Sequence, residues 1–265
     1  MATPQNSHHR LDSVSKTYHD SIELYIKRFL TLVGVALVPN LITYILILSL
    51  RASVISSIAR LNEIQDYFSL SNVNLYIAFL IFAIIIVVYI LGVIALTWTV
   101  INHEKATILG AFEHSLAYFW RFVAQSIALA LITTAGLLAG YLIVALIGVV
   151  LGNFSVELIN DWLGWLTLLP LLVSSIFSAF FLFAVYSIID KDNSTTKALQ
   201  HSFRMVRTHF WAVIVRVVLI YIFIYVLVFV LNLIPYVGNA FALLIVLPFA
   251  VVYLYVLYKN LDSAT

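Results

Sequence analysis

The feature that most constrains the fold of this chain is a series of six apolar stretches, each at least 20 residues long. About 20 apolar residues are enough for an α-helix to cross the hydrocarbon core of a bilayer. The chain is 63% hydrophobic and 10% charged, whereas soluble domains carry about 25% charged residues. We therefore expect an all-α polytopic membrane protein with six transmembrane helices, at residues 29–50, 75–101, 122–151, 162–189, 210–233 and 239–258.

The positions of the basic residues predict how the chain is threaded through the membrane. Eleven lysines and arginines lie in segments predicted on the same side of the membrane as the N-terminus. Two lie in the loops predicted on the opposite side. Because basic residues collect in cytoplasmic loops, we expect both termini in the cytoplasm and the chain in the cell (inner) membrane. Tryptophans favour bilayer interfaces, and the five here fall at predicted span ends: Trp98, Trp120 and Trp211 on the inner side, Trp162 and Trp165 on the outer side.

An amphipathic segment precedes the fifth predicted span. Leu199, Phe203, Val206 and Phe210 form one apolar stripe at helical period, and polar residues cover the other face. This pattern is typical of a helix that lies in the membrane interface and then turns into the bilayer. We call such a segment an elbow helix.

The elbow helix and the spans after it are predicted to occur three times. Phe29, Phe119 and Phe210 are 90 and 91 residues apart, and each follows an equivalent amphipathic segment. We expect three parallel repeats, each an elbow helix plus a helical hairpin, at about residues 13–101, 102–189 and 193–261. They form a single membrane domain over residues 13–261, preceded by a disordered cytoplasmic tail at 1–12. The alternative is that amphipathic segments accompany spans that start in the cytoplasm without any repeat.

Two details are expected in the first repeat. Pro39-Asn40 lies in the middle of the first span and predicts a kink there. Residues 51–74 are polar, with Val54, Ile58 and Leu61 among apolar residues at helical spacing, and they predict a separate surface helix.

The segments AFEHSLAYFWRF and KALQHSFRMVRTHFWAV resemble the elbow segments of a bacterial family of integral membrane domains. That family includes the membrane domain fused to some glycerophosphoryl diester phosphodiesterases and the stand-alone YciC-like proteins. The resemblance covers residues 13–261 and implies six helices with cytoplasmic elbows. It does not imply the phosphodiesterase activity, which belongs to a separate soluble barrel for which this chain has no segment.

Small residues recur at multiples of four in the third predicted span, a spacing that lets helix backbones approach closely. These residues are Gly136, Gly140, Gly148 and Gly152. The fourth span has Ser174 and Ser178 at the same spacing. We interpret these positions as helix-packing positions, with a ligand-lined groove as the alternative.

Four basic residues are candidate contacts for lipid headgroups. Lys197, Arg204 and Arg207 lie on the polar face of the third elbow helix, and Arg216 lies about a turn and a half inside the fifth span. A basic side chain near an anionic leaflet is worth about 1 kcal/mol, and Arg216 is expected to snorkel to the headgroups. The alternative for Arg216 is a role in transport or coupling.

Patterns that carry catalysis are absent from the sequence. It contains no HExxH, no GxSxG, no phosphate-binding loop, no dinucleotide fingerprint and no cysteine. We therefore expect no enzymatic activity, no cofactor, no metal and no nucleic-acid partner. The predicted function is to organise anionic lipid or partner membrane proteins at the cytoplasmic leaflet, and the alternative is transport of a small solute or lipid.

Overall fold

The computed structural model describes residues 11–61, 67–151, 168–234 and 238–264, and every regular element in these ranges is a helix. Six segments are long and apolar enough to cross a membrane: Phe29–Leu50, Tyr76–Ile101, Ile108–Val149, Leu169–Asp190, Phe210–Asn232 and Ala242–Asp262. The prediction of an all-α chain with six membrane-length helices is confirmed. The chain divides into two compact units. Unit 1 comprises Met1–Val14, Trp120–Leu219 and Leu257–Thr265, and unit 2 comprises Ser15–Phe119 and Ile220–Val256.

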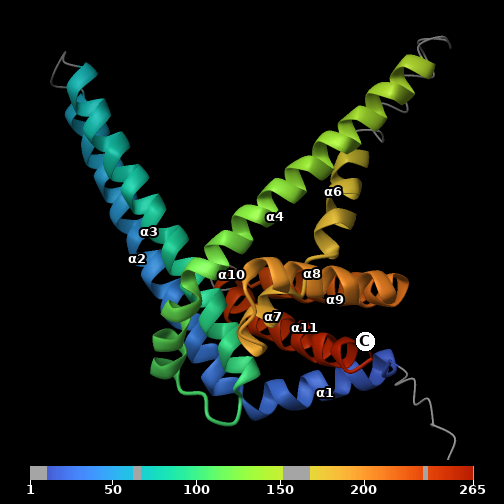
Figure 1. Ribbon diagram of the computed structural model, residues 1–265. Helices are drawn as coiled ribbons and strands as arrows, with labels where there is room; N and C mark the ends of the chain where they lie inside the picture. Colours follow the sequence, from blue (N-terminus) through green and yellow to red (C-terminus); the bar gives the residue numbers. More distant parts are fainter. Residues whose placement is uncertain (1–10, 62–66, 152–167, 235–237, 265) are drawn as a thin grey trace, which may run out of the picture. The chain divides into compact units, whose positions relative to one another are not determined.

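The first hairpin belongs to unit 2 and consists of α2 (Phe29–Leu61) and α3 (Tyr67–Ile101), which lie side by side (Figure 1). Gly92 lets the two helices approach closely, because a Cβ there would lie 2.7 Å from Cγ of Pro39. The predicted separate surface helix at 51–74 is wrong, since α2 extends to Leu61 and α3 begins at Tyr67. A helix satisfies its own backbone hydrogen bonds in lipid and in water alike, so a drop in hydropathy does not end it.

Unit 2 also contains most of α1 (Val14–Lys27) and the start of the sixth span. That span opens with α10 (Gly238–Phe241) and a π-helix, η1 (Ala242–Val246), and continues as α11 (Leu247–Asp262). The Tyr25 hydroxyl of α1 donates a hydrogen bond of 3.0 Å to the Ile245 carbonyl in the π-helix. The Tyr25 ring packs edge-on against Phe249, with centroids 5.5 Å apart. The side chain of one α1 residue therefore holds the irregular part of the sixth span.

The second predicted repeat differs from the expected layout. The expected elbow helix and the third span form one continuous helix, α4 (Ile108–Leu151). The fourth span is not continuous, because α6 (Leu169–Ala179) and α7 (Ala184–Asp190) are separated at residues 180–183. In the predicted third repeat, α8 (Thr195–Thr208) and α9 (Phe210–Asn232) are separated at His209, close to the predicted boundary.

The small residues of α4 and α6 bring two helix backbones of unit 1 together. A Cβ on Gly136 would lie 2.9 Å from Cα of Ser174, and a Cβ on Gly140 would overlap Cα of Pro170. The Ser174 hydroxyl donates a 3.1 Å hydrogen bond to the Thr133 carbonyl, which crosses the same interface. Gly136 and Gly140 are thus packing positions, as predicted.

The other two glycines of the predicted stripe are Gly148 and Gly152. No described atom lies within 4 Å of a Cβ built on Gly148, so its role in helix packing stays a prediction. The partner helix α6 begins at Leu169 and packs against α4 through Pro170 and Ser174. Gly152 lies outside the described residues, as do Trp162 and Trp165.

Candidate functional site

The candidate site is the exposed face of α8, whose N-terminus is fixed by three contacts within unit 1. Asp192 pairs with Arg121, and the Thr195 hydroxyl donates a 3.1 Å hydrogen bond to the Arg121 carbonyl. The Asn193 amide donates a 2.9 Å hydrogen bond to the Ser187 hydroxyl of α7. These bonds tie the residues before α8 to both α4 and α7, so the helix starts from a defined position.

The opposite face of α8 is buried, mainly through small residues. Ala198, Ser202 and Val206 are fully buried. The Ser202 hydroxyl donates a 2.9 Å bond to the Phe180 carbonyl and accepts a 3.2 Å bond from the Phe183 amide. These backbone groups are left unpaired where the fourth span is interrupted. Ser202 therefore supplies the missing hydrogen-bond partners between α6 and α7. Sequence reasoning did not identify this role, because the interruption carries no Gly or Pro.

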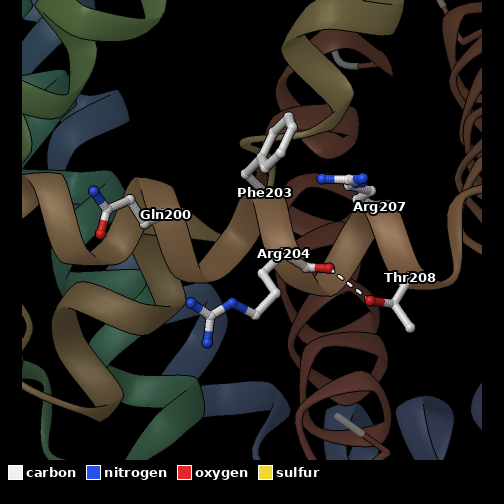
Figure 2. A pocket seen from close by; sticks show the side chains of 5 residues that line it. All are labelled: Gln200, Phe203, Arg204, Arg207 and Thr208. Atoms are coloured by element: carbon white, nitrogen blue, oxygen red, sulfur yellow. Dashed lines mark hydrogen bonds between the residues drawn. The ribbon is translucent and has the colours of Figure 1, made fainter.

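Three cations are exposed on the outer face of α8. We call Lys197, Arg204 and Arg207 the basic face; each is exposed, and none forms a salt bridge with a described residue. An open depression of about 440 Å³ lies over this face, lined by Gln200, Phe203, Arg204, Arg207 and Thr208. Figure 2 shows Arg207 and Phe203 pointing to one edge of the helix and Arg204 to the opposite edge. The guanidinium groups therefore flank a broad surface and do not converge on one small anion.

Large apolar side chains lie beside the basic face. Phe203 is 39% exposed, although its ring contacts Phe180 with centroids 5.2 Å apart, and Trp211 at the start of α9 is 76% exposed. The α8 surface therefore offers exposed hydrocarbon next to exposed cations. A helix in a bilayer interface needs this combination, because one side meets acyl chains and the other meets headgroups and water.

The charged groups at the C-terminal end of unit 1 are, by contrast, paired with one another. Lys259 binds both carboxylate oxygens of Asp190, at 2.9 and 3.0 Å. Lys191 and His201 both contact Asp262, at 2.5 and 3.1 Å. This network joins the end of α7 and one side of α8 to the end of α11, and it leaves these cations less available to an outside anion than those of the basic face.

Arg216 is placed differently from the expectation that it snorkels to the headgroups. Its side chain is 6% exposed, and one guanidinium nitrogen donates a hydrogen bond to the Asp12 carbonyl in unit 1. Its Nη1 is buried without a hydrogen-bond partner. Protein atoms therefore surround the Arg216 guanidinium, a position that does not fit the predicted direct headgroup contact.

Clusters of metal-ligating side chains were sought in the described residues. Within them, no group of three or more His, Asp or Glu side chains lies close enough to hold a metal ion. The His114 ring stacks on Trp98, with ring centroids 4.4 Å apart. No protein family, curated protein or solved structure matches the chain.

Proposed function

We propose that this chain is a non-enzymatic multi-pass membrane protein that holds anionic lipid at the cytoplasmic leaflet through the basic face of α8, and so organises lipid or partner proteins there. The observation that supports this function most directly is the exposure of Lys197, Arg204 and Arg207 beside the exposed Phe203 and Trp211. An anionic membrane surface is the partner that has both complementary charge and hydrocarbon.

The faces of α8 follow one another in an order that suits an interface. Residues advance by about 100° along a helix, so Ala198 and Ser202 share a buried face, Leu199 and Phe203 lie next to it, and the basic face follows. The apolar face thus lies between the protein and the cations. A helix built in this way buries one side on the bundle, immerses the second in acyl chains and leaves the third at the headgroups.

Equivalent positions before the first, third and fifth spans support three repeated elbow helices. Ser21, Ala111 and Ser202, which the 90- and 91-residue spacing aligns, are each 0% exposed. Three large apolar side chains that the same spacing aligns are 83%, 77% and 76% exposed, and these are Leu30, Trp120 and Trp211. The same order of buried, apolar and polar faces recurs in α1 and in the first turns of α4. A repeat predicts this agreement, whereas unrelated amphipathic segments do not.

The three proposed elbow segments also make equivalent contacts. The second and third elbow segments each contact the second span of the preceding repeat. The first elbow segment contacts the second span of the third repeat. In α8, Ser202 bonds the interrupted fourth span; in α1, Tyr25 bonds the sixth span at Ile245; and in α4, His114 stacks on Trp98 of the second span. We infer that the repeats share one packing rule and that the third, with its basic face, is specialised for anionic lipid.

The expected strength of the contact follows from its three cations. At about 1 kcal/mol each, they contribute about 3 kcal/mol, which is roughly a hundredfold in affinity. Changing Lys197, Arg204 and Arg207 together to Gln should therefore reduce retention of phosphatidylglycerol by the detergent-solubilised protein, measured by native mass spectrometry. Arg216 is left unchanged, because it is buried.

A variant with the same loss of charge elsewhere serves as the control. Lys16, Lys27 and Lys105 are exposed cations outside α8, and changing these three to Gln should leave the retained phosphatidylglycerol unchanged. If both triple variants lose the lipid equally, the protein holds it by net charge, and the proposal for α8 fails.

The alternative function, transport of a small solute or lipid, is favoured by one observation. Arg216 lies inside the fifth span, is buried and has an unpartnered Nη1, and an ionisable group within a membrane span is a candidate for a transport pathway. Flux of labelled solutes and lipids into proteoliposomes tests this function. A lipid-organising protein gives no flux above that of empty vesicles.

A further inference from the structure

A cavity of about 280 Å³ lies in unit 2 between α2, α3 and the start of the sixth span. We propose that it binds one acyl chain of a membrane phospholipid. Two of the side chains that line it, Ala36 and Leu96, are buried, at 3% and 2% exposed. Three others are exposed: Ile86 at 43%, Tyr89 at 59% and Leu243 at 44%. The cavity therefore reaches from the outer surface of the helices to residues that are otherwise covered by protein.

The lining of the cavity suits hydrocarbon. Asn40 is the most polar side chain in it, and its amide donates a 2.7 Å hydrogen bond to the Ala36 carbonyl of its own helix. Among the described residues, no Asp, Glu, Lys, Arg or His lines the cavity. The hydroxyls of Thr43 and Tyr89 are the other polar side-chain groups among the lining residues, and the remaining ones are apolar. An apolar chain fits these walls, and a charged or sugar-like ligand does not.

The position of the cavity indicates that the apolar chain belongs to a phospholipid of the bilayer. Its lining residues belong to the membrane-length segments Phe29–Leu50, Tyr76–Ile101 and Ala242–Asp262, and its exposed ones to the last two, so it opens onto the surface that acyl chains cover. Ala36 lies seven residues inside the first span, about 10 Å along the helix. A phospholipid whose headgroup stays at the interface can therefore place its chain in the cavity. Filling it restores the dispersion contacts that an empty hydrocarbon cavity lacks.

The π-helix gives this part of unit 2 a feature that regular helices lack. Leu243 lies in η1, and the Tyr25 hydroxyl bonds the Ile245 carbonyl of the same five-residue segment. π-helical turns are rare and are frequent at functional sites. The proposed acyl-chain site requires no charge and does not depend on the basic face of α8. Each proposal can therefore fail without the other.

Photolabelling tests the site directly. The protein is placed in nanodiscs of phosphatidylcholine in which some acyl chains carry a diazirine, and labelled residues are located by peptide mass spectrometry. We expect label on Leu96, which lines the cavity, and none on Ile94, which is 0% exposed and does not line it. If Leu96 is as unlabelled as Ile94, no chain enters and the proposal is overturned.

A matched pair of variants extends the test. Val93 lines the cavity, whereas Val87, on the same helix, is 41% exposed and does not. Val93→Phe should remove the label from Leu96, and Val87→Phe should leave it. Label on Leu96 in both variants contradicts occupancy of the cavity. If Val93→Phe misfolds, Ile94 becomes labelled, and the comparison of Leu96 with Ile94 in the unmodified protein then decides.

Discussion

The close approach of the α4 and α6 backbones at Gly140 offers a sharp test of the packing in unit 1. A methyl group on Gly140 of α4 would overlap Cα of Pro170 and lie 3.0 Å from its Cβ and 3.1 Å from its nitrogen. Pro170 belongs to α6, and its backbone and ring atoms cannot rotate away as a flexible side chain can. Gly140→Ala should therefore force α6 away from α4, and the larger Gly140→Leu should do so further.

The expected cost follows from two opposing effects. Ala favours a helix over Gly by about 1 kcal/mol, whereas inserting a methyl group into a packed interface costs about 1–3 kcal/mol. Gly148 lies in the same helix with no described atom within 4 Å of its Cβ position, so Gly148→Ala has the helix effect without the clash. The difference between the two variants therefore isolates the packing term, which we expect to be about 1–3 kcal/mol.

Thermal unfolding of both variants in one detergent provides the measurement. For a chain of this size, each kcal/mol shifts the melting temperature by about 2–4 °C, so Gly140→Ala should melt several degrees below Gly148→Ala. Equal melting temperatures would refute the reasoning, because they would mean that α4 and α6 do not approach at Gly140.

Three further predictions concern other parts of the chain. Tyr25→Phe removes the hydroxyl bonded to the Ile245 carbonyl while keeping the ring, so denaturant unfolding should show a loss of about 1 kcal/mol; no loss would mean that the bond does not stabilise the π-helix. Burial lowers the pKa of His201 below its usual 6.5, so the unfolded state binds more protons just below that pH. The free energy of unfolding should therefore fall as the pH drops from about 7.5 to about 5.5. This fall should be smaller in His201→Gln than in the unmodified protein. For orientation, a cysteine replacing Ser194 should not react with an impermeant thiol reagent outside intact cells, whereas one replacing Glu157, which lies outside the described residues, should react; the reverse result would invert the predicted topology.

Local signals in the sequence were sufficient for most of the helices. The fifth span was predicted at 210–233 and is found at Phe210–Asn232, because a long apolar run has one way to satisfy its backbone in lipid. The break before Phe210 follows from the amphipathic pattern of α8, in which the polar face stops where the apolar run begins. The close packing at Gly140 was also predictable, since small residues at a spacing of four indicate a helix contact.

Other features depend on residues that lie far away in the chain. The hydropathy of residues 51–74 indicated that this segment is polar, but it did not indicate where α2 ends and α3 begins. The backbone hydrogen bonds of a helix form in polar and apolar surroundings alike. Sequence reasoning assigned Arg216 to the headgroups from its depth in the span alone. The structure instead buries it against Asp12 of unit 1, a contact between residues about two hundred positions apart.

The sequence by itself determined that this chain is helical, that it has six membrane-length segments and that three cations share one face of α8. Length, period and charge position are local properties, and each of these features follows from them. The tertiary structure decided where the helices are irregular. The gap between α6 and α7 is stable because Ser202 of α8 bonds both of its ends, and the π-helix is held by Tyr25 of α1. An irregular helix leaves backbone groups without partners inside its own segment, so only the fold can determine which distant side chain satisfies them.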